Sequence, residues 1–270
     1  MKVTYQGETG AYSEMAVYKF FGRKVEPVPC KDFREVFESV KITAVPHGVV
    51  PIENSIEGSV NQNYDLFLSY DLKVCGEVAV KLAHVLIGNH QTKLEDIETV
   101  YSHPQALAQC RKYLEKHKWE IIPAYDTAGS VKIIKEKGLP NAAAIASEKA
   151  ADLYDMKILA RDIADNPSNY TRFLVLGLED AAPTGDDKTS IIFSAKHSPG
   201  TLYHALGEFA SRNINLTRIE SRPTKTTAWQ YNFYLDFEGH RTEKRCTEAL
   251  QALEKYATFV KILGSYPRVI

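Results

Sequence analysis

The sequence has no long apolar run, no excess of either charge and no signal-like start. Among its 270 residues, Lys and Arg number 33 and Asp and Glu number 34, so the formal net charge of −1 offers no basic surplus for nucleic acid. No stretch approaches the roughly 20 apolar residues of a membrane-spanning helix. The first ten residues lack the apolar core of a signal peptide. These absences argue against nucleic-acid and membrane partners and predict a cytoplasmic protein.

Metal-binding and dinucleotide motifs are also missing. The 4 cysteines are widely spaced and form neither a CxxC motif nor a His/Cys pair. The one glycine-rich loop after a strand, Gln6 to Gly10, does not follow the GxGxxG pattern. We therefore expect reduced structural thiols, no metal and no cofactor.

The sequence does contain polar loops at the ends of apolar strands, and the most informative runs from Asn169 to Phe173. Phe173 begins the apolar run Phe-Leu-Val-Leu, which predicts a strand buried on both faces. Thr171 and Arg172 therefore lie where a loop enters a sheet, and a hydroxyl and a guanidinium there are well placed to meet a small anion. From these residues alone, an ordinary strand entry with a surface arginine is the favoured interpretation.

Three further loops follow strands and precede helices. Gln6 to Gly10 leads into a helix over 11–21, an arrangement that suits an anion or a plain turn equally. Pro51 to Gly58 presents Glu53, Asn54 and Ser55 at a strand's carboxyl end, where ligands bind in open α/β sheets. Helix capping is the alternative role for Asn54 and Ser55.

The third such loop carries an Asp-Thr pair. Asp126 is a predicted N-cap, and Thr127 beside it can donate to a ligand from the helix end. Ser102-His103-Pro104 is a further loop of this kind; His103 is the one histidine in such a loop, and a structural hydrogen bond is its favoured role.

The last 80 or so residues show a separate pattern. Residues 179–188 are acidic and contain Pro and Gly, which is typical of a linker. The expected elements then alternate as βαββαβ, a ferredoxin-like order. They are strands over 189–195, 216–221, 229–237 and 260–263, and helices over 201–212 and 243–256.

Several motifs in order resemble those of prephenate dehydratases, and of the related arogenate dehydratases, over essentially the whole chain. They are Gly7-Glu8-Thr9-Gly10-Ala11-Tyr12-Ser13, Pro51-Ile52-Glu53-Asn54-Ser55, Ser102-His103-Pro104-Gln105-Ala106-Leu107, Asp126-Thr127-Ala128 and Asn169-Tyr170-Thr171-Arg172-Phe173. The C-terminal part resembles an ACT regulatory domain with the motif Glu220-Ser221-Arg222-Pro223. Its second motif, Pro199-Gly200-Thr201-Leu202, has Thr201 where many members have alanine.

The resemblance implies an α/β catalytic region of two lobes, similar to type II periplasmic binding proteins, followed by an α+β ACT domain. Lobe one would comprise about 1–78 and 160–179, and lobe two about 79–159. A linker over 180–187 would lead to the ACT domain over 188–270.

The resemblance also implies a carbon–oxygen lyase that converts prephenate to phenylpyruvate, with loss of water and carbon dioxide, in phenylalanine biosynthesis. Thr171 would hydrogen-bond the departing hydroxyl, and Arg172 would bind a substrate carboxylate through its planar fork. The other expected substrate contacts are Thr9, Glu53, Asn54, Ser55, Thr127, Asn169 and Phe173.

Regulation and assembly follow from the ACT resemblance. Phenylalanine would bind between two ACT domains as a feedback inhibitor, which implies a homodimer and, beyond it, a homotetramer. Its expected contacts are Pro199, Gly200, Thr201, Leu202, Glu220 and Ser221. Arogenate remains an alternative substrate, because residues 106–110 resemble arogenate-accepting forms and Glu53 suits an amino group. A non-catalytic amino-acid sensor is the alternative of another class.

Overall fold

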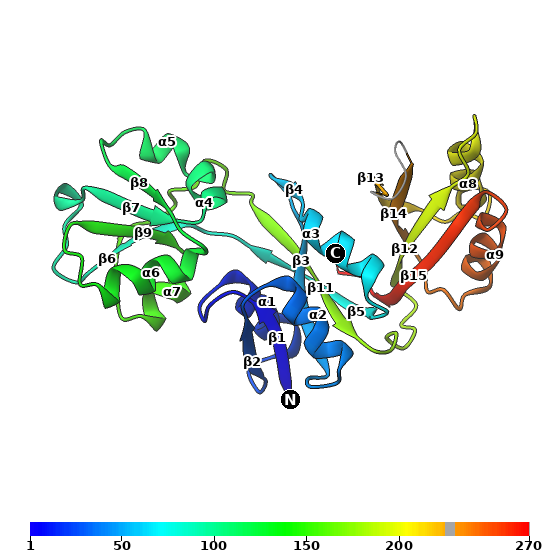
Figure 1. Ribbon diagram of the computed structural model, residues 1–270, viewed down its shortest axis with the longest axis horizontal. Coiled ribbons are helices and arrows are strands. Elements are labelled where there is room, and N and C mark those ends of the chain that lie inside the picture. Colours follow the sequence, from blue (N-terminus) through cyan, green and yellow to red (C-terminus); the bar gives the residue numbers. More distant parts are fainter. Residues whose placement is uncertain (225–229, 270) are drawn as a thin grey trace.

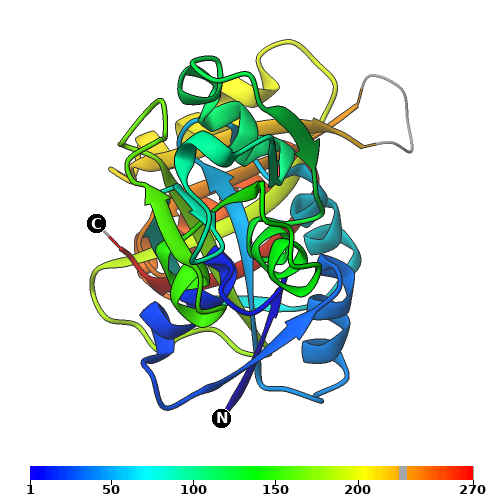
Figure 2. The same cartoon turned by 90° about the vertical axis from the view of Figure 1, so that its left-hand side faces the viewer.

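Two α/β lobes and a C-terminal domain follow one another along the long axis of this computed structural model (Figure 1). The structure describes residues 1–224 and 230–269. Lobe one lies between lobe two and the C-terminal domain. Figure 2 looks along the long axis with lobe two nearest the viewer.

Lobe one is built on a sheet in which three parallel strands are followed by an antiparallel pair. Across the sheet the strands are β2 (Glu26–Cys30), β1 (Lys2–Gln6), β3 (His47–Asn54), β11 (Tyr170–Gly177) and β5 (Lys73–Lys81), with β4 (Gly58–Ser59) paired to β3. The helices are α1 (Tyr12–Phe21), α2 (Phe33–Lys41) and α3 (Asn61–Ser69).

Lobe two repeats this topology, again with three parallel strands and then an antiparallel pair. Across its sheet the strands are β8 (Glu120–Pro123), β7 (Thr99–Ser102), β9 (Ala142–Ala146), β6 (Val85–Gly88) and β10 (Lys157–Ala160). The helices are η1 (Leu94–Asp96), α4 (Pro104–Gln109), α5 (Arg111–Leu114), α6 (Thr127–Glu136) and α7 (Glu148–Leu153).

The chain crosses between the lobes twice. It leaves the first sheet after Lys81 and returns to it at Tyr170, so the crossing segments are 82–84 and 161–169. On its return β11 is inserted between β3 and β5, although it is the last strand of the two-lobed part. This insertion brings the Thr171 stretch beside Asn54.

Successive side chains of β11 point to opposite faces, as in any strand. Phe173 and Val175 pack with α1 in one core cluster, whereas Leu174 and Leu176 belong to the cluster shared with the C-terminal domain. Both faces are buried, as the apolar run predicts.

The C-terminal domain has the expected βαββαβ order, and its sheet runs β13-β14-β12-β15. Its elements are β12 (Asp187–Ala195), α8 (Thr201–Ala210), β13 (Leu216–Pro223), β14 (Tyr231–Glu238), α9 (Lys244–Leu253) and β15 (Ala257–Pro267). Trp229, the expected first residue of the third strand, and Ile270 lie outside the described residues. The predicted fold class, two α/β lobes and then a ferredoxin-like domain, is confirmed.

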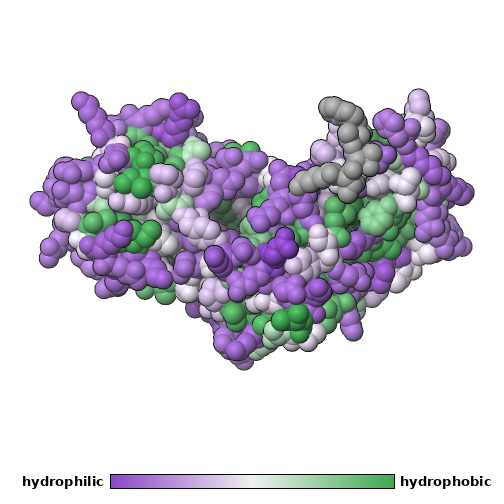
Figure 3. All heavy atoms as spheres, in the orientation of Figure 1, coloured by the Kyte–Doolittle hydropathy of each residue, from purple (hydrophilic) through white to green (hydrophobic). Residues whose placement is uncertain are grey.

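The exterior is mostly hydrophilic in the view of Figure 3, with hydrophobic residues in scattered patches. Over residues 1–224 and 230–269, no helix is long and apolar enough to span a bilayer.

The C-terminal domain docks on lobe one through β15 and β5. A Cβ added at Gly264 of β15 would lie only 2.2 Å from the Val74 carbonyl oxygen of β5. Side chains from both units, among them Val74, Tyr234 and Tyr266, form one core cluster around this contact. Lobe one and the C-terminal domain therefore share a hydrophobic core.

We predict that Gly264→Ala destabilises the protein by about 1–3 kcal/mol, because the new methyl group meets backbone that cannot move aside. The matched control is Gly207→Ala in α8, where nothing lies within 4 Å of the added Cβ. That variant should be stabilised by about 0.5–1 kcal/mol, since alanine favours a helix. Thermal unfolding of both variants is the measurement, and an unchanged melting temperature for Gly264→Ala would contradict the close-docking interpretation.

Candidate active site

A cleft of about 630 Å³ lies between the two lobes. Its volume is within the range of roughly 300–1,000 Å³ that small-molecule sites occupy. Asn54, Thr171 and Phe173 line it from lobe one, and Gln109 and Thr127 line it from lobe two. The interlobe position expected for the polar loops is thus observed.

The Thr171 hydroxyl is oriented by Asn54. The two residues are direct partners in the pairing of β11 with β3, and Asn54 Nδ2 lies 3.0 Å from Thr171 Oγ1. Asn54 Oδ1 accepts the backbone N–H groups of Ile56 and Glu57, each at 2.9 Å, so the amide nitrogen must face Thr171. Because Thr171 Oγ1 accepts this bond, its own proton is free to be donated into the cleft.

A chain of hydrogen bonds continues from Asn54 into lobe two. Asn54 Nδ2 donates to Asn169 Oδ1 at 2.7 Å, and Asn169 Nδ2 donates to Gln109 Oε1 at 2.8 Å. His84 Nε2 lies 2.9 Å from the same Gln109 oxygen and must donate to it, since that oxygen only accepts. Burial lowers the pKa of His84, although the bond to Gln109 opposes this shift. The chain joins the lobes and sets the orientation of the Gln109 amide at the cleft wall.

Sequence reasoning did not single out Gln109 or His84. Within the described chain no protein partner is found for Gln109 Nε2, so this amide nitrogen can donate to a ligand in the cleft. The available signal was its place at the end of the short helix that follows His103-Pro104. The loops predicted to bind a ligand lie at strand ends, whereas Gln109 is the last residue of the helix α4.

Helix ends, and not cationic side chains, are the groups in the described cleft wall that can attract an anion, and they lie beside the carboxylates of Asp32 and Asp126. No Lys or Arg is among the described residues that line the cleft. The helices α1, α3 and α6 all begin at the cleft wall, at Tyr12, Asn61 and Thr127. No described side chain caps the N-terminus of α1 or α3, so their first N–H groups and their dipoles can serve an anion.

Asp126 and His103 occupy the lobe-two wall. One Asp126 oxygen caps α6 by accepting from Gly129, whereas Oδ2 is buried and has no partner among the described residues. Burial raises the pKa of Asp126. Burial lowers the pKa of His103, whose Nδ1 accepts from the Gln105 N–H at 3.2 Å and so helps to cap α4. This bond agrees with the structural role favoured for His103. No group of three or more His, Cys, Asp or Glu side chains within 1–224 and 230–269 is placed to hold a metal ion.

Three other expected contact residues are not among those that line the cleft. Asn169 is fully buried and holds Asn54 and Gln109. Ser55 Oγ accepts from the Tyr170 N–H at 2.9 Å and donates to the Ser168 carbonyl at 3.2 Å, which ties the loop to β11. Thr9 contacts lobe two, where its carbonyl accepts from Tyr154 at 3.4 Å. The structure therefore gives these three residues supporting positions.

Arg172 and Glu53, both expected at the substrate, are not among the residues that line the cleft. Their side chains leave the opposite face of the sheet and bond to each other, with Arg172 Nη2 3.1 Å from Glu53 Oε2. Burial alone would lower the pKa of Arg172, but Asp236, Tyr266, Glu77 and Glu53 outweigh it and raise the pKa. Both terminal nitrogens of this guanidinium bond to protein carboxylates. This geometry does not support a substrate contact for Arg172 or for Glu53, because neither lines the cleft.

The residues expected to bind phenylalanine divide into two groups. Gly200 has φ +80° at the start of α8, where the buried Thr201 bonds locally to Ser198 at 2.7 Å. Pro199 is exposed and Leu202 is partly buried beside them, and Ser221 is exposed on β13. Glu220 instead turns toward lobe one and bonds to Ser59 and Arg218.

Comparison with known proteins decides the family. Residues 3–181 match the family described as Prephenate dehydratase, and residues 189–255 match the ACT domain. The chain belongs to the prephenate dehydratase family. It is 44% identical to a prephenate dehydratase of Methanocaldococcus jannaschii over 98% of this chain and 97% of that one. It is 45% identical to an arogenate dehydratase/prephenate dehydratase of Arabidopsis thaliana over 99% of this chain and 73% of that one.

Solved structures of similar chains agree with this membership. The prephenate dehydratase of Arthrobacter aurescens in complex with L-Phe gives a TM-score of 0.91 at 33% identity, covering 99% of this chain and 90% of that one. A second structure, described as "GqqA- a novel type of quorum quenching acylases", gives a TM-score of 0.90 at 30% identity, covering 100% of this chain and 98% of that one. The resemblance drawn from the motifs is confirmed for both domains.

We predict that Asn54→Asp lowers kcat by about 10²- to 10³-fold on the substrate of this site, because a carboxylate would accept the Thr171 proton instead of donating to its oxygen. The side chain keeps its size and its bonds to the Ile56 and Glu57 N–H groups. Steady-state kinetics beside a circular-dichroism check of folding provide the measurement, and a kcat within twofold of wild type would refute the orienting role.

Proposed function

We propose that this protein converts prephenate to phenylpyruvate, releasing water and carbon dioxide. The observation that carries the proposal is the Thr171 hydroxyl, which Asn54 orients as a donor inside a cleft lined by uncapped helix N-termini. Prephenate is a small dianion with a ring hydroxyl that must depart, so it needs anion sites and a donor in one cavity. Family membership supports the same reaction.

The reaction requires one bond to break at each end of the ring. When the C–CO₂ bond breaks, its electron pair completes the aromatic ring, and the ring hydroxyl leaves with the C–O pair and takes up one proton from solvent to become water. Thr171 would hydrogen-bond the departing oxygen, and Gln109 Nε2 is a second neutral donor at the wall. A threonine hydroxyl is too weak an acid to give its proton up outright, so polarisation and positioning carry the step. The helix ends of α1 and α3 would hold the carboxylates.

Replacing the hydroxyl tests the proposal. We expect Thr171→Val, which keeps the shape and removes the donor, to lower kcat by about 10²- to 10³-fold. Thr171→Ser keeps the donor and should retain most activity. The appearance of phenylpyruvate absorbance from prephenate is the readout. Equal turnover by Thr171→Val and wild type would remove Thr171 from the reaction, and no turnover by a folded wild-type protein would remove the proposed function.

Regulation by phenylalanine and self-association belong to the same proposal. The ACT match and the L-Phe complex of the similar Arthrobacter aurescens enzyme support a ligand site beside Pro199, Gly200, Thr201, Leu202 and Ser221. β13 is an edge strand whose exposed Ile219 offers a surface to a second copy, which supports a dimer and, beyond it, a tetramer. The four cysteines are free, which supports a reducing compartment such as the cytoplasm.

We predict that phenylalanine lowers activity and raises the melting temperature of the wild type, as any ligand selective for a folded state must. In Gly200→Val, both inhibition and the rise in melting temperature should need at least about tenfold more phenylalanine. A β-branched residue is strained at φ +80°, so the substitution distorts the backbone beside the expected ligand. Thr201→Ala is the control and should keep them. Absence of any phenylalanine effect at millimolar concentration would refute the site.

Arogenate is a second candidate substrate, supported by the arogenate dehydratase relative. Its side-chain ammonium needs an acceptor, and Asp126 Oδ2 is the buried cleft-wall oxygen without a partner in the described chain. This replaces the role expected of Glu53, which lies on the other face. The measurement is kcat/KM on prephenate and on arogenate, for the wild type and for Asp126→Asn. A fall in kcat/KM of the variant on arogenate alone supports the contact between Asp126 and the ammonium group.

The acylase description of one similar structure raises a further chemistry, acyl transfer. That chemistry needs a nucleophile activated by a neighbouring base. Within the described part of the cleft wall, Thr171 bonds to Asn54, and His84 bonds to Gln109 and Tyr12. No described Ser, Thr or Cys hydroxyl or thiol is paired with either cleft histidine, so the geometry favours the dehydratase reaction.

A further inference from the structure

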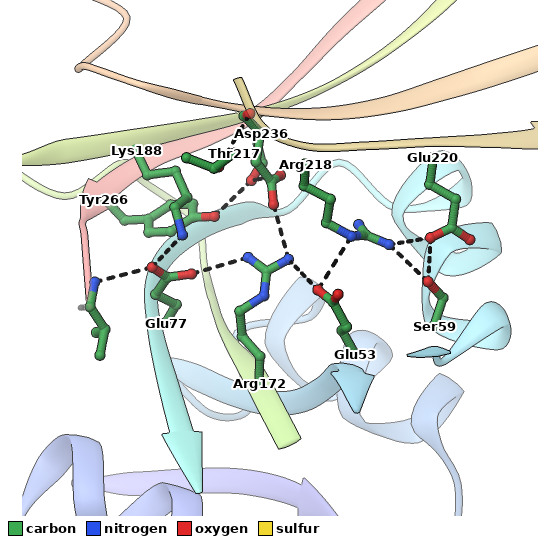
Figure 4. A network of polar contacts seen from close by, with 12 residues as sticks. Glu53, Ser59, Glu77, Arg172, Lys188, Thr217, Arg218, Glu220, Asp236 and Tyr266 are labelled. Carbon is green, nitrogen blue, oxygen red and sulfur yellow. Dashed lines mark hydrogen bonds and ion pairs between the residues drawn. The ribbon is translucent and has the colours of Figure 1, made fainter. Parts of the chain in front are cut away.

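The cluster of charges around Arg172 joins lobe one to the C-terminal domain (Figure 4). Arg172 Nη1 lies 3.1 Å from Glu77 Oε2, and Nη2 lies 3.1 Å from Glu53 Oε2 and 3.0 Å from Asp236 Oδ2. Glu53 and Glu77 belong to lobe one, whereas Asp236 lies on β14 of the C-terminal domain. One guanidinium, with only 19% of its side chain exposed, is thus held by carboxylates from two domains.

Glu77 completes the junction from the other side. Its Oε1 accepts from Lys188 Nζ at 2.7 Å and from the Val269 N–H at 3.1 Å, and both donors belong to the C-terminal domain. Lobe one alone would leave two carboxylates, Glu53 and Glu77, with the single cation Arg172 at this surface. Lys188 and Arg218 place positive charge against Glu77 and Glu53, and Asp236 places negative charge against Arg172, so these buried charges each gain an oppositely charged partner from the other domain.

Hydrogen bonds within the C-terminal domain hold the Asp236 carboxylate in place. Its Oδ1 accepts from Ser190 Oγ at 2.6 Å, and Ser190 is in turn bonded to the Tyr266 hydroxyl at 2.7 Å. Burial would raise the pKa of Asp236, but Arg172 and Arg218 lower it, so the carboxylate stays ionised. The position of the C-terminal domain is therefore transmitted to Arg172 through a rigid, charged contact.

The cluster and the cleft share the same two stretches of backbone. Thr171 pairs with Asn54 across β11 and β3, and the next pair in register is Arg172 with Glu53. The first pair reaches the cleft, and the second pair reaches the C-terminal domain. A displacement of Arg172 must therefore move the backbone that carries the Thr171 hydroxyl.

A neighbouring set of contacts connects the same two places. Arg218 of β13 lies 3.3 Å from Glu53, and Glu220 of β13 bonds to Ser59. Arg222 bonds to Asn61, and both Ser59 and Asn61 line the cleft. The edge strand of the C-terminal domain thus contacts the cleft wall directly.

We propose that Arg172 is a positioning residue, which anchors the Thr171 strand to the C-terminal domain through Asp236. Any movement of that domain then changes the placement of the Thr171 hydroxyl, and with it kcat. The kinetic part of this inference rests on the proposed function, whereas the structural part does not.

Two substitutions approach the contact from its two sides. Asp236→Asn keeps the size and the acceptor for Ser190, and Arg172→Lys keeps a charge without the fork. We expect each to lower kcat on prephenate by about tenfold or more, because a catalytic group displaced by 1 Å can lose about 10²-fold. KM should stay within about twofold, and the double variant should lose little more than either single one.

Controls separate this role from general weakening of the domain. Glu238→Gln removes a more exposed ion pair to Arg268 from the same strand β14, and its kcat should equal that of wild type. Ser190→Ala keeps every charge and removes the hydroxyl that bonds Asp236 and Tyr266, so it should show a smaller loss of kcat and provides a milder variant if Asp236→Asn does not fold.

A rise in KM at unchanged kcat in Arg172→Lys would overturn the proposal, because it would return Arg172 to substrate binding. Hydrogen exchange provides a readout that needs no substrate. The amides of β11 should exchange faster in Asp236→Asn or Ser190→Ala than in Glu238→Gln. Equal exchange in all variants would overturn the anchoring role, even if the wild-type protein did not turn over prephenate.

Discussion

The antiparallel pairing of β11 with β3 is the constraint on which the site depends. Thr171 can be oriented by Asn54 only because the two are partners in this register. The same register places Arg172 against Glu53 on the other face. A shift of one residue would exchange the two faces, sending the guanidinium into the cleft and the hydroxyl into the junction with the C-terminal domain. The strand pairing therefore sets both the chemistry and its connection to the rest of the protein.

The absence of Lys and Arg from the described cleft lining has a chemical consequence. The full charges of lobe one at this sheet pair with each other and with Asp236 and Lys188, away from the substrate cavity. Anion affinity in the cleft is left to N–H groups and helix dipoles, which are fixed by the backbone and need no reorganisation when charge moves off a carboxylate. A mobile arginine would hold the departing carboxylate most tightly in the ground state. Fixed dipoles stabilise an anion without such selective stabilisation of the ground state, which would raise the barrier to decarboxylation.

Much of the fold could be predicted from the sequence, because apolar runs and strand-end loops alternate regularly. Thr171, Asn54 and Thr127 were expected at the cleft and do line it. Thr171 lies at the start of β11, Asn54 ends β3, and Thr127 begins the helix that follows β8. Arg172 and Glu53 could not be placed, because β11 is buried on both faces and shows no polar alternation. In addition, a bulge in the β11–β3 pairing makes Phe173 the partner of Pro51 and leaves Ile52 out, so that Ile52 and Glu53 both face the C-terminal domain. Gln109 was missed because it closes a helix rather than opening one.

The shared core explains why the C-terminal domain can act on chemistry that it does not touch. If the C-terminal domain were joined to lobe one by a flexible linker alone, its rotation would not displace the residues of the cleft. Here β15 packs against β5 with Gly264 directly on the Val74 backbone, and β5 in turn pairs with β11. Packed interiors change position as units rather than bending gradually. A movement of the C-terminal sheet must therefore either carry β5 and β11 with it or break the ionic contacts of Arg172, and both alternatives alter the geometry at Thr171.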